Sequence, residues 1–487
     1  MRKNNTNRRF AGKKLLVSAL AALTLTAGLA GCKKVTPQEA VSEAVTKTMT
    51  ESSINDLIGQ EKLNKKMTED LKYSMDYSFT LEEISGEGLD EELANTLAGI
   101  GFDVESNMDI EDKKMAGTLD INYGGSTYLS VEAGLADSLI SLAVPQLFDG
   151  FISIDYDTLL EDIKNNPMFA DALSMVDESA FEEFTMDELW DAFTESQNLD
   201  LESMGIDISD LTDAWESFED AIEYNELKVK EADLPKEVSA KTAYEIVITE
   251  EAYSGLIKEF FYFIFDEIIP EIDSFIQEMG GETEPFETPS EEDVDSVISD
   301  ITDAIGDIEI TVAITKDGYL SYVYCEHTIE DVEIELEAML TGKKNPTDDI
   351  AFELTIVNTE DETATFTYDQ TFDTKENTIA FEGKFEIEDD EEVDGFSFSG
   401  EGEYSDIKKG EKYTFDLNFF ELDFSDIFSI TLSGSMSIDT TDVDTDQPDG
   451  KEYSLFNMTE DEFTALGEEI ITNIENDPLF SELLEME

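Results

Sequence analysis

Polar and apolar residues alternate with a period of two over much of this chain. The clearest run covers residues 73–81, where Tyr, Met, Phe and Leu take every second position between polar residues. The same alternation returns from 307 to about 438, interrupted by turn signals such as Lys316-Asp317-Gly318. Since successive side chains of a strand point to opposite faces, this pattern predicts long antiparallel meanders with one apolar face.

The segments that follow residues 73–81 also alternate between polar and apolar residues, except over 134–148. The pair Gly124-Gly125 separates two alternating stretches and predicts a tight hairpin turn. The stretch 134–148 breaks the alternation and is predicted to be a small amphipathic or loop segment. Strands are predicted over 102–110, 115–123, 126–131 and 150–156.

Helical spacing is concentrated in the middle of the chain and near its end. Residues 254–279 are apolar nearly all round, but charged residues at 258, 259, 266 and 267 argue against a membrane span. We therefore expect a helix buried between other elements. Further helices are predicted over 179–196, 209–224 and 459–474, and one more is predicted to start at Ser290.

These elements predict an α+β protein. We expect large, curved antiparallel sheets, arranged as meanders like open half-barrels, packed with amphipathic and buried helices. The expected divisions are a leader (1–31), a tether with a short helix (32–67), a first strand-meander unit with a helical insertion (68–250), a central apolar helix with a linker and a helix (251–306), and a second meander with a C-terminal helix (307–487).

The leader combines a basic start with an apolar run. Residues 1–14 hold six Lys and Arg and no acid, and Leu15 to Leu29 is rich in Leu, Ala and Val, which is typical of a secretory signal peptide. The run ends in Leu29-Ala30-Gly31-Cys32, which resembles a bacterial lipobox. That resemblance implies cleavage between Gly31 and Cys32 and a diacylglycerol on Cys32, with the chain lipid-anchored on the outer face of the bacterial cell membrane.

The net charge of the chain limits the classes of partner that it can bind. The chain carries 117 Asp and Glu against 30 Lys and Arg, a net charge of −87, and every Arg lies in the leader. Binding to nucleic acid requires Lys and Arg that displace counterions from phosphates, so nucleic acid is excluded as a partner. If Cys32 carries lipid, Cys325 has no partner for a disulfide within the chain.

Candidate chemistry is sparse. Cys325 and His327, the only His, share one face of a predicted strand, but a Cys–His catalytic pair needs direct contact and two ligands are too few for zinc. We expect no catalytic residues and no enzyme. The one candidate metal site is a calcium loop with Asp442, Asp444, Asp446 and Asp449, although Gln447 stands where an EF-hand has its turn Gly; no other cofactor is indicated.

A lipobox followed by strand meanders and apolar helices resembles the LolA/LppX-like superfamily of open half-barrel lipoproteins. It is similar, too, to large acidic lipoproteins of unknown function in Gram-positive bacteria. The resemblance implies a non-enzymatic envelope protein that binds a hydrophobic, lipid-like ligand or a protein partner. Two alternatives stay open, a substrate-binding protein of an importer and a secreted hydrolase that uses carboxylates.

Overall fold

The structure is a computed structural model of the whole chain and divides into two compact units. It describes residues 36–169, 185–186, 190, 209–270, 290–330, 332–358, 362–388, 393–424 and 427–476. Unit 1 holds residues up to Ser53 together with 199–374 and 380–397, and unit 2 holds 54–198, 375–379 and 398–487. Each unit is therefore discontinuous in sequence. The consecutive boundaries proposed above stay a prediction.

The described strands form an 18-stranded sheet, and most neighbouring strands along it are also neighbours in sequence and antiparallel. Two described pairings depart from this order. Strand β17 (Phe428–Asp439) pairs antiparallel with β1 (Lys72–Gly86), and the short β18 (Glu452–Ser454) pairs parallel with β6 (Phe151–Asp155). The predicted α+β class with a large antiparallel meander and helices is confirmed. The strands β14 (Thr378–Glu388) and β15 (Val393–Lys408) contribute residues to both units.

Unit 1 contains a meander of strands with helices against one face. Its strands are β7 (Glu223–Leu227), β8 (Thr242–Ile248), β9 (Ile308–Ile314), β10 (Leu320–Ile329), β11 (Val332–Leu340), β12 (Asp349–Val357) and β13 (Thr363–Asp373). Its helical segments are α2 (Pro37–Thr50), α10 (Ser209–Ala221), α11 (Glu250–Tyr262), η3 (Phe263–Ile268), α13 (Glu291–Ile305) and the 3₁₀ turn η4 (Pro346–Asp348).

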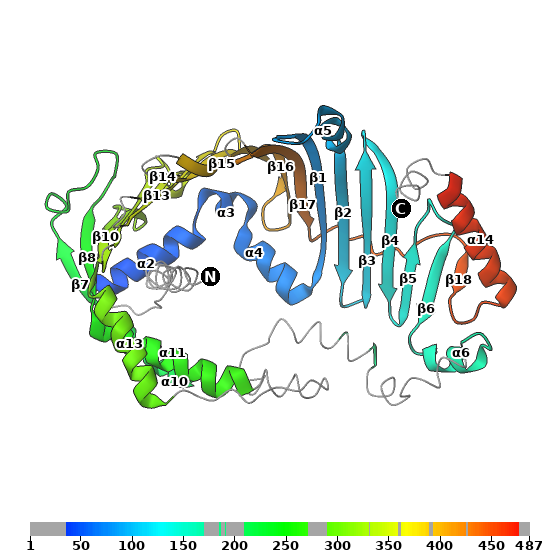
Figure 1. Cartoon of the computed structure of the whole chain (residues 1–487), viewed down its shortest axis with the longest axis horizontal. Coiled ribbons are helices and arrows are strands. Elements are labelled where there is room, and N and C mark those ends of the chain that lie inside the picture. The colour runs from blue at the N-terminus through cyan, green and yellow to red at the C-terminus, as the bar shows by residue number, and fades with distance from the viewer. Residues whose placement is uncertain are drawn as a thin grey trace. The chain divides into compact units, whose positions relative to one another are not determined.

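The core of unit 1 lies between strands β8–β11 and four helices, α2, α10, α11 and α13. Ile308, Ile310 and Val312 alternate along β9 and are at most 2 % exposed, as period-two burial requires. Figure 1 shows α10, α11 and α13 packed beside one another. The Tyr253 hydroxyl donates to the carbonyls of Thr302 and Gly306, which fixes α11 against the end of α13.

The expected apolar helix at 254–279 is observed in part. Helix α11 starts at Glu250 with Thr249 as its N-cap and continues into η3, while residues 271–289 lie outside the described residues. Its buried side chains pack into the core, whereas Phe260 is 50 % exposed. The starts of α13 near Ser290 and α10 at Ser209 agree with the predicted helices, and most of 179–196 lies outside the described residues.

Unit 2 is built on a second run of antiparallel strands. The strands are β1 (Lys72–Gly86), β2 (Ile100–Asp109), β3 (Lys114–Tyr123), β4 (Ser126–Ala136), β5 (Leu139–Ala143), β6, β16 (Lys412–Phe424), β17 (Phe428–Asp439) and β18. Its helices are α3 (Ser53–Ile58, starting in unit 1), α4 (Gln60–Lys65), η1 (Lys66–Asp70), α5 (Glu91–Leu97), α6 (Leu159–Asn165) and α14 (Glu460–Asn476). In Figure 1 the arrows β1 to β6 follow one another in sequence order.

Two apolar clusters stabilise unit 2. In the first, Leu63 of α4 is 1 % exposed and packs with Ile58, Tyr413 and Ile438 against one face of β1, β16 and β17. The second joins α14 to β6 and β18 through Phe148, Tyr453, Met458 and Leu466. The opposite face of β1 and β17 is polar, since Ser74 pairs there with Asp439 and Asp76 with Ser437.

Two turn predictions have opposite outcomes. Gly124 and Gly125 both have positive φ, +58° and +80°, and close the β3–β4 hairpin as predicted. The small amphipathic or loop segment predicted over 134–148 is wrong up to Ala143, because β4 continues to Ala136 and β5 forms a strand, whereas 144–148 is irregular as predicted. The signal was hidden because β5 buries the small Ser141 and Ala143, while its larger Ile140 and Leu142 are more than 40 % exposed.

Candidate functional site

Polar residues form a ladder across the face of β2, β1, β17 and β16 in unit 2. Strand register pairs Asp76 with Glu105 on one side and with Ser437 on the other, and Ser437 pairs in turn with Thr414. The adjacent row is Asn107, Ser74, Asp439 and Lys412, in the same pairing. Residues two apart on a strand share a face, so both rows lie together; we call them the polar ladder.

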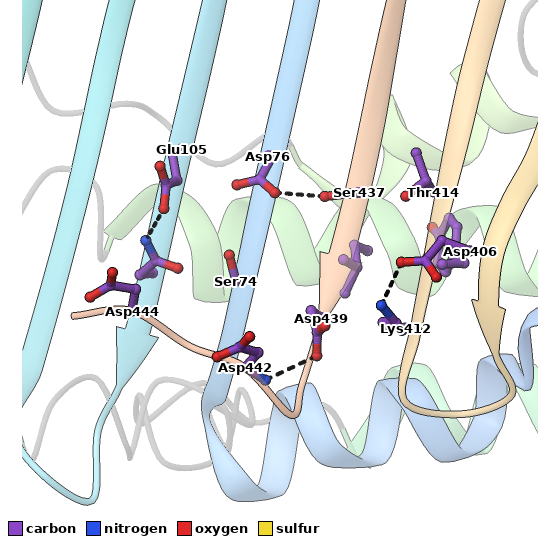
Figure 2. A pocket seen from close by; sticks show the side chains of 13 residues that line it. Ser74, Asp76, Glu105, Asp406, Lys412, Thr414, Ser437, Asp439, Asp442 and Asp444 are labelled. Atoms are coloured by element: carbon purple, nitrogen blue, oxygen red, sulfur yellow. Dashed lines mark hydrogen bonds and ion pairs between the residues drawn. The ribbon is translucent and has the colours of Figure 1, made fainter. Parts of the chain in front are cut away.

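The polar ladder is the floor of a hollow of about 420 Å³, a size typical of small-molecule sites. Asp442 and Asp444, from the segment after β17, and Asp406 of β15 add carboxylates to its lining. Figure 2 shows the loop with Asp442 and Asp444 crossing the ends of β1 and β2 next to the ladder. The lining is therefore dominated by carboxylate and hydroxyl oxygens.

Asn107 differs from the other residues of this lining because it is buried and its side-chain oxygen has no donor. It is 4 % exposed, and its Nδ2 donates a hydrogen bond of 2.7 Å to Oε1 of Glu105. Its Oδ1 is buried and has no hydrogen-bond partner. A buried acceptor without a donor costs free energy comparable to a lost hydrogen bond, and this one lies in a wall of the hollow.

The acids of the hollow differ in how their oxygens are used. Oδ2 of Asp76 accepts a hydrogen bond of 2.6 Å from the Ser437 hydroxyl, which leaves its second oxygen to the hollow. Oδ1 of Asp439 accepts from the amide and hydroxyl of Thr441 and from the amide of Asp442. Partial burial works to raise the pKa of Asp439, but these hydrogen bonds outweigh it and hold the pKa below its usual value.

Lys412 is the one cation of the lining, and it is already paired. Its Nζ contacts Asp406, and this hydrogen bond raises the pKa of Lys412 above its usual value. The remaining carboxylates in the lining, from Asp76, Glu105, Asp439, Asp442 and Asp444, leave the hollow with a net negative charge. Such a site favours a positively charged ligand with N–H groups and repels anions.

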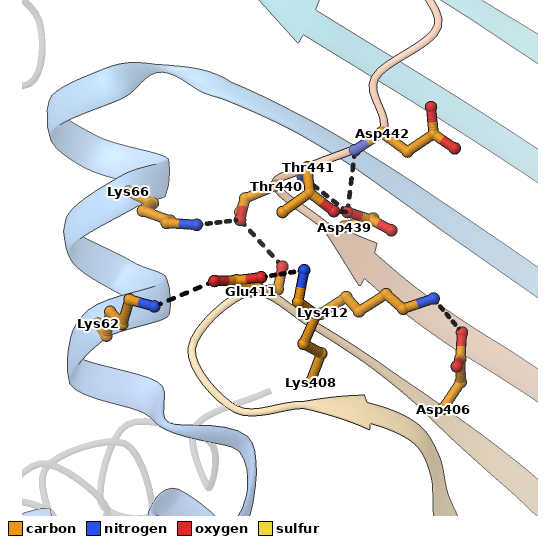
Figure 3. A network of polar contacts seen from close by, with 10 residues as sticks. All are labelled: Lys62, Lys66, Asp406, Lys408, Glu411, Lys412, Asp439, Thr440, Thr441 and Asp442. Carbon is orange, nitrogen blue, oxygen red and sulfur yellow. Dashed lines mark hydrogen bonds and ion pairs between the residues drawn. The ribbon is translucent and has the colours of Figure 1, made fainter.

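A network at the edge of the hollow holds the helix η1 and the β15–β16 turn in place (Figure 3). Glu411 pairs with Lys62 of α4 at 3.3 Å and with Lys408, and both lower the pKa of Glu411 to about 2. Lys66 of η1 reaches Thr440 Oγ1 at 3.3 Å, and that hydroxyl donates to the Glu411 carbonyl. The start of the loop that carries Asp442 is thereby tied to β16.

The candidate calcium residues lie in the irregular segment between β17 and β18. Asp442, Asp444 and Asp446 are exposed, and Oδ1 of Asp444 accepts from the Asp446 amide in a local turn. Gln447 anchors this segment to β3 and β5 by donating to the Met115 carbonyl and accepting from Ser141. Within the described residues no three His, Cys, Asp or Glu are grouped for a metal ion. Calcium binding by these Asp and by Asp449 stays a prediction.

The other predicted site residues are placed as follows. Gly31 and Cys32 lie outside the described residues, so cleavage and acylation stay predictions. Cys325 is 7 % exposed, and burial raises the pKa of its thiol to about 11. His327 lies two residues further along β10; burial lowers its pKa, and its Nε2 is buried without a hydrogen-bond partner. The absence of catalytic residues stays a prediction.

The residues of the polar ladder were missed by the sequence reasoning. They occupy the polar positions of alternating strands, which the pattern identifies only as a non-core face. A signal was present in Asn107, an amide at a position where Asp103 and Glu105 precede it on the same face of β2. Asp442 and Asp444, which line the same hollow, lie more than 300 positions away in sequence, and no local pattern reports that they share a site with Asn107.

Comparisons with known proteins give little to build on. No family model matches the chain, and no curated protein matches it. Among solved structures, the chain is similar to one described as the low pH structure of Pseudomonas putida OprB, with 7 % identity, coverage of 78 % of this chain and 96 % of that chain, and a TM-score of 0.21. A TM-score this low does not establish a shared fold, and no function is taken from it.

Two expectations are corrected here. The resemblance to the LolA/LppX-like superfamily is wrong, since the described strands form one sheet of 18 strands. The function drawn from it, the binding of a hydrophobic ligand or a protein partner, is wrong as well, as are its importer and hydrolase alternatives. The helix-covered faces are filled by packed side chains, and the hollow is lined by acids. Within the described residues, no helix has the length and apolar character needed to span a membrane.

Proposed function

We propose that the polar ladder binds a small organic cation that carries N–H donors. The observation that carries the proposal is the buried, unpartnered Oδ1 of Asn107 in a hollow lined by carboxylates. An ammonium group placed there supplies the missing donor and neutralises the neighbouring acids in one contact. Charge-assisted hydrogen bonds of this kind are stronger than neutral ones.

Other ligand classes suit the lining less well. An apolar ligand would remove solvent from the carboxylates of Asp76 and Glu105 and would leave each with a single side-chain donor, from Ser437 and Asn107 respectively. An anion would meet five acids against one Lys that Asp406 already holds. A diamine offers its positive charges to separate acids of the lining, such as Asp76 and Glu105.

Calorimetric titration of the purified protein with putrescine, at low salt, tests this function. The isosteric double variant D76N/E105Q removes two charges from the hollow while keeping oxygens that accept from Ser437 and Asn107. We expect a loss of affinity of roughly tenfold, since each lost contact is worth about 1 kcal/mol or less.

The chain offers a matched control for diffuse attraction to an acidic surface. Glu421 and Asp423 are exposed residues of β16, outside the lining of the hollow, so E421Q/D423N removes the same charge in the same unit. We expect this control to leave the affinity within about twofold. Equal losses in the two double variants, or no binding of putrescine to the unchanged protein, would overturn the proposed function.

The location of the protein is a second, separate proposal. The basic and apolar leader and the residues Leu29 to Cys32 support export and acylation of Cys32, which would hold the chain on the outer face of the cell membrane. Growth of producing cells with an alkyne-bearing fatty acid labels the unchanged protein and leaves the C32S variant unlabelled on this proposal. Equal labelling of both proteins, or of neither, contradicts it.

A further inference from the structure

The carboxylates of unit 2 continue beyond the hollow in one direction. On β2, Asp103 lies two residues before Glu105 and therefore on the same face. Strand register pairs Asp103 with Asp120 of β3. The acids thus follow one path over three neighbouring strands, which runs from Asp76 to Glu105, then to Asp103 and finally to Asp120.

The outer end of this path also has an acceptor without a donor. Asp120 is half-buried, and its Oδ1 is shielded from solvent and has no hydrogen-bond partner. Asp103 and Asp120 stand directly opposite each other, and like charges in a cross-strand pair destabilise a sheet. One oxygen of Asp103 accepts a 2.6 Å hydrogen bond from the Asn122 side chain, and no Lys or Arg lies among these four acids. A cation is the group that this pair lacks.

The spacing between the acids of this path fits a linear ligand with several separated positive charges better than a single compact cation. Opposed residues of neighbouring strands lie about 5 Å apart, and residues two apart on a strand about 7 Å apart. Ammonium groups joined by short methylene spacers can meet successive carboxylates at these intervals. The sheet fixes the acids in place, so each further amine adds a contact without an ordering cost for the protein.

We propose that the ligand is a linear polyamine, held at one end by Asn107 and Asp76 and extended over Asp103 and Asp120. This rests on the proposed function and adds the ligand class and the direction of binding. The path predicts that affinity rises with the number of amines, because a longer ligand reaches the outer pair.

Titrations with putrescine, spermidine and spermine test the proposal on the unchanged protein and on D103N/D120N. We expect the outer variant to bind putrescine within about twofold of the unchanged protein and to bind spermine roughly tenfold more weakly. The control E421Q/D423N carries the same loss of charge on β16, and its spermine affinity is expected to change by less than about twofold.

The outcomes separate the two proposals. If D103N/D120N binds spermine as the unchanged protein or the β16 control does, the extended path is overturned, while the hollow stands if D76N/E105Q still weakens putrescine. If D76N/E105Q has no effect on putrescine, both proposals fail. Circular dichroism of each variant before titration verifies that the sheet is intact, and the Asn and Gln replacements keep the size of the acids and one acceptor oxygen of each.

Discussion

The side-chain amide of Asn107 donates to Oε1 of Glu105 at 2.7 Å, from two positions further along the same strand. This bond fixes the amide orientation and directs the nitrogen to the carboxylate, so the Asn107 oxygen is left as a buried acceptor without a donor. The sheet thereby keeps an unfilled hydrogen-bonding position next to a set of acids. Sites of this kind are less stable than they could be and are retained where they bind something.

Replacement of Asn107 by Leu separates binding from stability. The apolar side chain of similar size removes the unsatisfied oxygen, so we expect the melting temperature to stay the same or to rise by a few degrees. Affinity for putrescine is expected to fall by roughly tenfold. Thermal denaturation and calorimetry on the same samples measure both. A variant that melts lower and binds as well as the unchanged protein would show that the oxygen serves the fold alone.

The burial of Leu63 predicts that unit 2 is sensitive to shortening of this side chain. It is 1 % exposed and joins α4 to the apolar face beneath the ladder. The substitution Leu63→Ala is expected to cost about 2–5 kcal/mol in free energy of unfolding, as for other buried Leu residues. The matched control Leu93→Ala changes an α5 residue that is 47 % exposed and is expected to cost below about 1 kcal/mol. Comparable losses, measured by denaturant unfolding, would place the core elsewhere.

Much of the fold could be predicted from the sequence, because a strand that buries one face shows alternating apolar and polar residues. The strand at 73–81, the turn at Gly124-Gly125 and the helix starting after Ser290 all follow from local pattern. Strand β5 could not be predicted, since its buried positions are small residues and its large ones are exposed. The hollow could not be predicted either, because strand pairing brings Ser74 beside both Asn107 and Asp439, residues far apart in sequence.

The pairing of Glu411 with Lys62 and Lys408 predicts a pH dependence of stability. These contacts lower its pKa from an ordinary 4.5 to about 2. The folded state therefore binds this proton less readily than the unfolded state does, so the stabilisation is complete above about pH 4.5 and is lost as the pH falls towards 2.

The difference in melting temperature between the unchanged protein and E411Q measures this linkage. We expect the difference to be constant near neutral pH, to shrink as the pH falls below about 4.5, and to diminish in high salt because the pair is exposed to solvent. The variant E421Q, with the same change of charge on β16, is the control. A difference for E411Q that grows as the pH falls would contradict the assigned direction.

Burial of Cys325 predicts an unreactive thiol in the folded protein. Desolvation raises its pKa from 9.0 to about 11, so at pH 8 the thiolate is roughly 100-fold scarcer than for an exposed thiol. In the C32S variant, whose one remaining Cys is Cys325, we expect a disulfide reagent to label no thiol in the native state and one thiol per chain in denaturant. Rapid native labelling would show that β10 opens easily.

The central claim is that Asn107 and its neighbouring acids bind an amine, and a crystal structure of the protein with spermidine tests it most directly. The account predicts an ammonium nitrogen within about 2.7–3.2 Å of Asn107 Oδ1 and beside the carboxylate of Asp76, with the chain directed towards Asp103. A structure in which Asn107 Oδ1 is bonded to water or protein alone, with spermidine absent from the hollow or scattered over other acids, would contradict the account.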